Sequence, residues 1–448
     1  AALSSDPRIA GLAFTGGTDT AKRIDRAMAD ALPSDAMLVA ETGGLNAMIV
    51  DSTALPEQAV RDIVISAFQS AGQRCSALRM LYVQEDVAER TLDMLTGAMG
   101  ELRLGNPWAL STDVGPVIEA QAKAAIDAHV EAARAEGRLV KALATPAEGH
   151  FTAPALIRVS GIEALDREVF GPVLHVATYR AGDLDRVVDA INAKGYGLTF
   201  GLHTRIDDRV QQVLERVRVG NSYVNRNQIG AIVGSQPFGG EGLSGTGPKA
   251  GGPHYLPRFR KPAGAAAVPG IAEAGGPSLD AAALTRALAA LPEAGPAGEP
   301  ETLPGPTGES NRLATAPRGR VLCLGPAGAL GAQVEKALAA GNAVLAVGPG
   351  EAPAHPRLAR IEGRVDPEAL AEARGLDAVV DDGPEEERRA IRRALAAREG
   401  PVMPLLSAAE PGARFAHERH VCIDTTAAGG NASLLAEAEA PPPRAAAE

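Results

Sequence analysis

The sequence predicts an α/β protein in which helices lie on the faces of a parallel sheet. Two observations support this fold class: short apolar runs alternate with helix-forming stretches, and several of the runs end in glycine turns. Residues 8–14 precede a Thr-Gly-Gly turn and a predicted helix at 18–31, and residues 37–41 precede a second Thr-Gly-Gly turn. Strands that alternate with helices in this way are typical of parallel sheets.

The same order continues along the chain. It predicts a helix at about 56–71, a strand at 78–83 and a long helix around 119–136. Past Arg260 the residues are mainly Ala, Gly and Pro, which predicts a connection interrupted by one helix at 279–291. A strand at 321–325, a helix at 329–340 and a strand at 343–347 follow. We therefore expect a first domain over 1–258, the connection over 259–318, a Rossmann-like second domain over 319–435 and a frayed tail over 436–448.

Length and charge narrow the class of protein. The 448 residues are enough for two or three domains, and the net charge of −11 provides no positive field for a nucleic acid or an anionic membrane surface. No run of about 18 apolar residues and no signal sequence is present, so we expect a cytoplasmic protein. Three scattered cysteines indicate reduced thiols and no zinc cluster. Because the chain starts at Ala1 without methionine, we expect a fragment of a longer polypeptide.

Two side chains together indicate a chemistry. Cys75 follows a predicted helix within Gly-Gln-Arg-Cys-Ser (72–76), and Glu41 ends a predicted strand at the sheet edge where ligands of parallel sheets bind. A lone cysteine is usually a core residue and a lone strand-terminal glutamate is usually solvated. As a pair they fit aldehyde oxidation: a thiolate adds to the carbonyl, a hydride leaves to a nicotinamide, and the carboxylate activates water against the thioester.

A glycine turn provides a place for the cofactor. Phe14-Thr15-Gly16-Gly17 lies at the start of the predicted helix at Thr18. Free backbone N–H groups and the helix dipole make such a terminus a site for a pyrophosphate.

Five motifs resemble the aldehyde dehydrogenase superfamily over about residues 1–258. They are Phe-Thr-Gly-Gly (14–17), Glu-Thr-Gly-Gly-Leu-Asn (41–46), Gly-Gln-Arg-Cys-Ser (72–76), Glu-Val-Phe-Gly-Pro-Val (168–173) and Gln-Pro-Phe-Gly-Gly (236–240), and 34 residues separate Glu41 from Cys75. The resemblance implies that Cys75 is the nucleophile, Glu41 the general base and NAD the cofactor. It implies cofactor contacts at Phe14, Thr15, Gly16, Gly17, Thr18, Thr42, Gly43, Glu168 and Phe170. The family's oxyanion asparagine and adenine-side lysine belong to a first half that we expect to precede this chain.

The glycine-rich stretch 228–252 resembles the glutamate-semialdehyde dehydrogenases of that superfamily and, more narrowly, the carboxyl-terminal part of the bifunctional proline utilization A family. This resemblance implies L-glutamate γ-semialdehyde as the substrate, its carboxylate bound by backbone N–H groups of the loop. It implies substrate contacts at Arg74, Ser76, Gly230, Ala231 and Phe238, and no metal. It also implies an upstream FAD-dependent proline dehydrogenase domain in the same polypeptide, and we expect a homo-oligomer.

The carboxyl-terminal part resembles a degenerate copy of the family's nucleotide-binding domain. Residues 375–391 repeat the strand, glycine turn and charged helix of 11–24. Glycines 325, 328 and 331 depart from the Gly-x-Gly-x-x-Gly spacing and no carboxylate ends the following strand, so we expect no cofactor there. Residues 421–433 resemble the terminal motif that covers the cavity between active sites in longer proline utilization A proteins, and Cys422 within it is interpreted as structural.

Two alternatives remain at this point. The chain could be an aldehyde dehydrogenase for another carboxylated aldehyde. It could also be a catalytically incomplete fragment that serves as a scaffold and lid.

Overall fold

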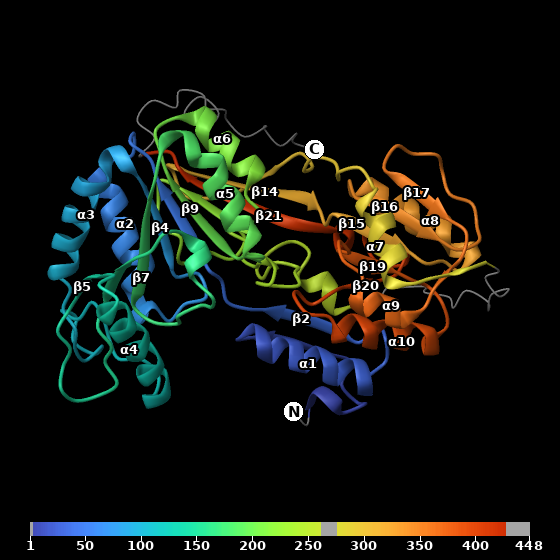
Figure 1. The fold of residues 1–448 in the computed structure, drawn as a ribbon, viewed down its shortest axis with the longest axis horizontal. Coiled ribbons are helices and arrows are strands. Elements are labelled where there is room, and N and C mark those ends of the chain that lie inside the picture. The colour runs from blue at the N-terminus through green and yellow to red at the C-terminus, as the bar shows by residue number, and fades with distance from the viewer. Residues whose placement is uncertain (1–2, 261–275, 427–448) are drawn as a thin grey trace, which may run out of the picture.

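A ten-stranded mixed sheet is the largest element of the computed structural model, which describes residues 3–260 and 276–426 (Figure 1). The strands from β21 to β6 are parallel neighbours, and antiparallel pairs lie at both ends of the sheet. In spatial order they are β13 (Glu301–Leu303), β14 (Glu309–Pro317), β21 (Ala416–Asp424), β10 (Asn221–Val224), β9 (Thr199–His203), β3 (Ala47–Val50), β4 (Met80–Gln84), β7 (Val173–Tyr179), β6 (Ala155–Arg158) and β5 (Leu139–Ala142).

Helices cover both faces of this sheet because its central strands are apolar on both sides. In β3, Met48 and Val50 belong to one buried cluster, and Ala47 and Ile49 belong to the other. This alternation is the period of two that a strand imposes. The first cluster includes α2 (Pro56–Phe68), α3 (Glu85–Gly100) and α4 (Ala120–Ala135), and the second includes α5 (Leu184–Ala193) and α6 (Asp207–Arg216).

The amino-terminal elements form a small unit of their own. β1 (Gly11–Thr15) pairs in parallel with β2 (Met37–Glu41), and α1 (Thr18–Ala31) buries Met28 against them. Their register places Thr15 opposite Glu41, and the Gly16 N–H donates to the Glu41 carbonyl at 3.1 Å. The glycine turn and the predicted base therefore lie at the same sheet edge.

A second, five-stranded parallel sheet forms the carboxyl-terminal domain, in the strand order of a doubly wound fold. α8 packs on one face, and α7, α9 and α10 pack on the other. The strands are, in spatial order, β17 (Leu358–Ile361), β16 (Ala343–Val347), β15 (Arg320–Cys323), β19 (Ala378–Val380) and β20 (Leu405–Leu406), and the helices are α7 (Ala281–Ala289), α8 (Ala327–Ala339), α9 (Pro367–Glu372) and α10 (Glu385–Ala397). Two short pairs, β8 (Tyr196–Gly197) with β11 (Glu241–Gly242) and β12 (Ser278–Leu279) with β18 (Arg364–Val365), complete the strands.

The predicted turn after β15 is occupied by a side chain of the protein itself. Gln333 of α8 accepts a hydrogen bond from the Gly325 N–H at 3.0 Å and donates to the Gly325 carbonyl at 2.8 Å. Its amide also donates to Asp382 at 2.7 Å. These contacts use the turn groups that a dinucleotide needs, which supports the expectation of no cofactor at this turn.

The terminal motif expected at 421–433 is described only as far as Thr426, and its first residues belong to β21. β21 lies inside the large sheet, parallel to β10 on one side and antiparallel to β14 on the other. The connection expected over 259–318 therefore ends in two strands of the large sheet, β13 and β14. Composition cannot indicate this pairing, since the hydrogen-bonding partner of β14 is about a hundred residues away. The tail expected at 436–448 lies outside the described residues.

No helix among the described residues is long and apolar enough to span a membrane.

Candidate active site

Cys75 follows a tight turn that only a few residue types adopt. After α2 ends at Phe68, Ser70 and Ala71 have φ of 57° and 55° and Gly72 has φ of 64°. A Cβ at Gly72 would lie 2.1 Å from the Gly171 carbonyl oxygen, so a glycine is required there. Such conformations cost energy in non-glycine residues and cluster at functional sites, which is consistent with a special role for the residues that follow.

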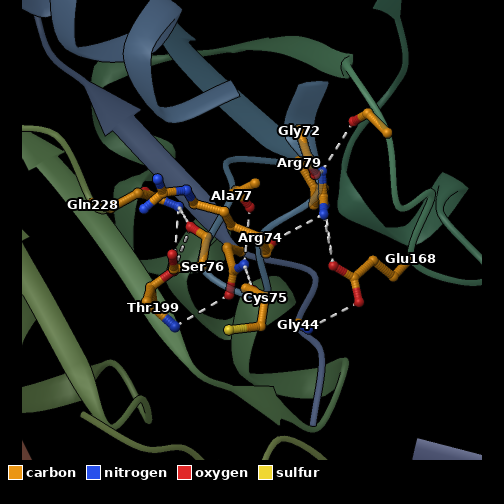
Figure 2. Close-up of polar contacts among 12 residues, drawn as sticks. Gly44, Gly72, Arg74, Cys75, Ser76, Ala77, Arg79, Glu168, Thr199 and Gln228 are labelled. Carbon is orange, nitrogen blue, oxygen red and sulfur yellow. Dashed lines mark hydrogen bonds and ion pairs between the residues drawn. The ribbon is translucent and has the colours of Figure 1, made fainter. Parts of the chain in front are cut away.

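Main-chain groups around Cys75 are fixed by buried amides (Figure 2). Asn46 Nδ2 donates to the carbonyls of Cys75 and Ala77 at 2.7 and 2.9 Å, and its Oδ1 accepts from the Thr199 N–H at 3.1 Å. The next carbonyl, of Ser76, accepts from Thr199 Oγ1 at 3.2 Å and from Gln228 Nε2 at 3.3 Å. The thiol therefore projects from a backbone held by Asn46, just before β3, and by Thr199 of β9.

A buried guanidinium supports the same turn from behind. Arg79 of the segment before β4 is 1% exposed and donates to the carbonyls of Gly72, Arg74 and Gly171 at 2.8, 3.1 and 3.1 Å. It also pairs with Glu168 at 2.9 Å (Figure 2). A rigid fork of several donors suits this task better than a lysine would.

Glu168 is held between this arginine and the loop after β2. Its second oxygen accepts from the Gly44 N–H at 3.3 Å, and a Cβ at Gly43 would lie 1.9 Å from that oxygen. Burial raises the pKa of Glu168 and the Arg79 guanidinium opposes that rise. Phe170, two residues further on, is 45% exposed and its ring centroid lies 5.3 Å from the Arg79 guanidinium carbon. The carboxylate and the exposed ring are thus arranged as a pair at one edge of the site.

The thiol of Cys75 is neutral in this environment at physiological pH. Burial raises its pKa first, and the negative charges of Glu168 and Glu41 raise it further, against the lowering effect of the Ser76 N–H. A reacting thiolate therefore requires a group that takes the proton.

Glu41 is a nearby carboxyl with the properties of a general base that can activate water. The Gly240 N–H donates to its Oε2 at 2.9 Å, and its Oε1 is buried with no hydrogen-bond partner in the described part of the chain. Burial raises the pKa of Glu41 to about 8, and the Gly240 N–H and the Lys249 ammonium limit that rise. Cβ atoms at Gly239 and Gly245 would come within 3.1 and 2.8 Å of the carboxylate, so these glycines allow the loop to enclose it. A base with a pKa near neutrality suits proton transfer at physiological pH.

Lys249 lies behind this loop and is 2% exposed. Its ammonium donates to the Gly239 carbonyl at 2.5 Å and to Asn221 Oδ1 at 2.7 Å. Burial lowers the pKa of Lys249 to about 8, while the charges of Glu41 and Glu418 oppose the change. The lysine and Glu41 thus form one coupled, buried pair.

The predicted cofactor residues line the start of α1. Gly17 has extended backbone before the helix, and a Cβ there would meet nothing within 4 Å, so space is open at the helix terminus. A Cβ at position 16 would lie 2.5 Å from the Phe14 ring, which explains why this residue is also a glycine. Thr18 and Thr42 were expected to contact the cofactor. In the structure both hydroxyls donate to the Leu243 carbonyl, at 3.5 and 2.6 Å. They hold the loop around Glu41 as well as flanking this space.

The predicted substrate residues divide into two groups. Ser76 and Phe238 are structurally fixed: Ser76 is 5% exposed, and Phe238 exchanges main-chain hydrogen bonds with Ala250 at 2.9 and 2.8 Å. Gly230 and Ala231 lie exposed on the loop that begins at Gln228, which itself contacts the Ser76 carbonyl. Arg74 is the least constrained member, with one side-chain hydrogen bond to Ser70 Oγ at 3.1 Å.

Four residues of the site were not singled out from the sequence: Asn46, Arg79, Gln228 and Lys249. Arg79 had a signal, since a cation interrupts the apolar run 78–83. Asn46 ends the motif that begins at Glu41, but nothing in its position indicates that it orders the Cys75 backbone.

Within the described residues no group of three or more metal-ligating side chains is gathered.

Comparison with known proteins identifies the family. The sequence profile of the aldehyde dehydrogenase family matches residues 1–262, more than half of the chain. The chain belongs to the aldehyde dehydrogenase family. The nucleophile turn, the enclosed carboxyl and the glycine turn described above all lie within the part that this family profile covers.

Relatives within the family differ in how much of the chain they match. The bifunctional protein PutA of Escherichia coli K12 is 44% identical over 97% of this chain and 36% of its own length. The 1-pyrroline-5-carboxylate dehydrogenase of Geobacillus sp. WCH70 is 38% identical over 57% of this chain and 50% of its own length. The match to the bifunctional relative thus includes the carboxyl-terminal domain, whereas this chain spans only about a third of that relative.

Solved structures agree with this assignment. A crystal structure of bifunctional proline utilization A has a TM-score of 0.57 and 57% identity, over 58% of this chain and 26% of the other. A 1-pyrroline-5-carboxylate dehydrogenase from Thermus with bound NAD has a TM-score of 0.54 and 33% identity, over 58% of this chain and 51% of the other.

Proposed function

We propose that this chain carries out the oxidation of L-glutamate γ-semialdehyde, formed from pyrroline-5-carboxylate, to L-glutamate, the second step of proline catabolism. The observation that carries the proposal is the pairing of a thiol on a rigid turn with a buried carboxyl whose pKa lies near 8. Relatives named 1-pyrroline-5-carboxylate dehydrogenase, whose sequences align with 57% of this chain, support the choice of aldehyde.

The residues divide the reaction into two steps. Cys75 loses its proton to solvent water, and its sulfur forms a bond with the aldehyde carbon, which makes a tetrahedral adduct with negative charge on the former carbonyl oxygen. Loss of a hydride from that carbon leaves a thioester on the sulfur. Glu41 then takes a proton from a water molecule, whose oxygen attacks the thioester carbonyl, and the bond to sulfur breaks to release the carboxylate. The departing thiolate takes the proton held by Glu41, which restores the thiol and the carboxylate.

NAD is the cofactor we propose, and when bound it accepts the hydride. The space at the start of α1 and the exposed ring of Phe170 fit such a group. The related dehydrogenase from Thermus, whose structure was solved with bound NAD, supports this choice. Gly16 and Gly17 would hold the pyrophosphate and Glu168 the nicotinamide ribose. Because Arg79 already pairs with Glu168, we infer that the arginine sets the position of this carboxylate.

The substrate carboxylate is assigned to the loop at Gly230 and Ala231. Both residues are exposed and Gly230 has φ of 78°, a conformation that turns backbone N–H groups outward. Phe238 would supply an apolar wall, Ser76 a hydroxyl and Arg74 a cation near the nucleophile. We further propose that the chain acts within a longer polypeptide that carries an FAD-dependent proline dehydrogenase domain, as the word bifunctional in its relatives' names suggests.

The test is a pair of variants in the longest polypeptide in which the chain occurs. Cys75→Ala should reduce NADH formation from the semialdehyde by at least a hundredfold while NAD binding, measured by calorimetry, stays unchanged. Cys323→Ala is the matched control, since that thiol lies in β15 of the other domain and should keep its activity.

Glu41→Gln separates the two steps. It should allow one NADH per site in a single turnover and then stall, because only hydrolysis of the thioester needs the base. Activity above a few per cent in Cys75→Ala would overturn the nucleophile assignment, and absence of the burst in Glu41→Gln would overturn the base assignment.

A further inference from the structure

A cavity of about 420 Å³ lies between the part of the chain that carries Glu41 and the carboxyl-terminal domain. One wall is formed by the loop 246–249 behind Glu41 and by residues 257–260, and the other by Arg318, Lys336 and residues 409–418. Cavities of this size at domain interfaces are common places for small ligands. Neither the chemistry of Cys75 nor the space at α1 uses it.

The charge of this cavity is strongly one-sided. Its lining contains six lysines and arginines and only two glutamates. A neighbouring cavity of about 960 Å³ is lined by seven arginines and six aspartates or glutamates and is therefore nearly balanced. The two cavities share Arg258, Arg260, Arg318 and Arg414, and the acidic residues that balance these cations line the larger cavity only, apart from Glu410.

One carboxylate serves several cations there. Glu410 lies 3.3 Å from Arg414 and 4.0 Å from Arg258, and its backbone carbonyl accepts from Lys336 at 2.7 Å. Arg318 donates through Nε to the Arg414 carbonyl at 2.8 Å, which draws a third guanidinium into the group. The Nε of Arg258 is buried and has no hydrogen-bond partner among the described residues.

The other carboxylate of the lining is already engaged. Glu418 accepts from the Lys249 backbone N–H at 2.8 Å and pairs with His254 at 2.8 Å. It therefore offers little neutralisation to the three arginines, for which Glu410 is the shared carboxylate of the lining, while Glu241 and Asp377 act on Arg318 from outside it.

The pKa values of the arginines show that burying their charge is unfavourable. Burial lowers the pKa of Arg318 to about 9 and of Arg258 to about 10, and the nearby charge of Arg414 lowers both further. A guanidinium stays protonated at neutral pH, so these shifts indicate positive charge that the nearby carboxylates compensate only in part.

We propose that this cavity binds a small molecule with two or more negative charges, carboxylate or phosphate, between Arg258, Arg318 and Arg414. Arginine forks are suited to both groups, because each can accept two parallel hydrogen bonds. The prolines and alanines of the lining, Pro248, Pro257, Pro411 and Ala413, leave room for a short apolar body. Since the ligand would contact both parts of the chain, its binding would link the carboxyl-terminal domain to the loop that encloses Glu41.

Calorimetric titration of the full chain with inorganic phosphate and, separately, with succinate tests the proposal. At least one probe should bind with saturation at one site per chain. Arg318→Met should weaken that binding at least tenfold. Glu410→Gln should strengthen it several-fold, because it removes the carboxylate that competes with the ligand for the same cations.

Two control variants distinguish binding in this cavity from the catalytic chemistry and from a general loss of positive charge. Arg286→Met, an exposed arginine of α7, should bind as the unaltered chain does. Cys75→Ala should also bind normally, because the cavity does not involve the thiol. If Arg318→Met fails to fold, Arg318→Lys replaces it and should still weaken binding, since it keeps the charge but loses the fork.

The absence of saturable binding with both probes would overturn the proposal. Equal affinity in the unaltered chain, Arg318→Met and Glu410→Gln would also overturn it. A purely structural role for the arginines would not produce changes of opposite sign in the two variants.

Discussion

Glu41 is a carboxyl enclosed by backbone rather than by side chains. The glycines at 239, 240 and 245 approach it closely, and one oxygen has an N–H partner while the other has none among the described residues. An enclosed carboxyl with little compensation keeps its proton to a higher pH than a solvated one. Lys249 moderates this effect from behind the loop. The value near 8 therefore belongs to the buried pair and not to Glu41 alone.

The first prediction concerns the pH dependence of this pair. Because the base must be ionised to activate water against the thioester, kcat for the semialdehyde should rise with pH and level off above about 8. Initial rates between pH 6 and pH 9.5 measure this, with pH-independent activity contradicting the role of Glu41.

The same carboxyl should affect stability in the opposite sense. Its folded pKa of about 8 lies above the ordinary value of 4.5, so the stabilisation from holding the proton is complete below 4.5 and is lost as pH rises through 8. Glu41→Gln should therefore melt at a higher temperature than the unaltered chain at pH 8.5 and at the same temperature near pH 4.5. Glu101→Gln, an exposed carboxyl at the end of α3, is the matched control and should show no such difference.

At the level of elements, β21 contributes to the catalytic loop as well as to the sheet. It pairs with β10 along four residues, and its side chains reach residues 241–254. Arg419 donates to both oxygens of Glu241 at 3.0 and 2.8 Å. Although burial alone would raise the pKa of Glu241, the Arg419 guanidinium lowers it to about 2. A strand from the far end of the sequence thus anchors the loop that encloses Glu41.

The prediction for this element is made with Arg419→Met. Removing the guanidinium leaves a carboxylate that is 8% exposed without its counter-charge, at a cost of about 2 kcal/mol in the free energy of unfolding. That figure is below the cost for fully buried pairs because Arg419 itself is 23% exposed. Urea unfolding at pH 7 measures it. Arg419→Met combined with Glu241→Gln should recover part of the loss, and equal stability of all three chains would contradict the anchoring role.

At the scale of the whole molecule, two domains with separate cores share one sheet. β14 and β21 connect the carboxyl-terminal domain to the catalytic sheet, and α10 contacts the amino-terminal unit through Glu385, which accepts from the Ser34 N–H and hydroxyl at 2.8 and 2.6 Å (Figure 1). Arg392 of the same helix donates to the carbonyls of Pro33 and Ser34. Unfolding of the second domain would therefore remove strands and contacts from the first.

We predict that damage to the second core destabilises both domains. Leu345 of β16 is fully buried, and Leu345→Ala should cost about 2–5 kcal/mol. Hydrogen exchange should then increase in peptides of β10 as well as in peptides of β16, because both belong to one cooperative unit. Leu110→Ala, at an exposed position, should change neither set of peptides. An increase confined to β16 would show that the domains unfold independently.

Local sequence patterns were sufficient to predict several helices and strands. The helix predicted at 18–31 and the strands predicted at 37–41 and 343–347 agree with α1, β2 and β16 residue for residue. These segments have one clear hydrophobic period and definite glycine boundaries, so their conformation depends little on distant parts of the chain. The helix predicted at 56–71 was too long, because the chain leaves the α-helix at Phe68 for the turn that positions Cys75.

The candidate nucleophile and base could be identified from motifs, whereas the residues that position them could not. Arg79 is recognisable only as a cation in an apolar run, and its partners at Gly171 and Glu168 lie about ninety residues away. Lys249 has no local signal, since its role depends on burial beside Glu41 and Asn221. A hydrogen bond between distant segments leaves no period in either of them.

The sequence alone determined the fold class, the family, several of the helices and strands, and the identity of Cys75 and Glu41 as the candidate reactive pair. These depend on local propensity and on short motifs, each of which spans only a few residues. Only the tertiary structure decided which sheet β21 joins, how Arg79 and Lys249 support the site, and where six cations surround a cavity. The physical reason is that strand pairing, burial and electrostatic compensation are properties of segments brought together by folding, and no single segment carries them.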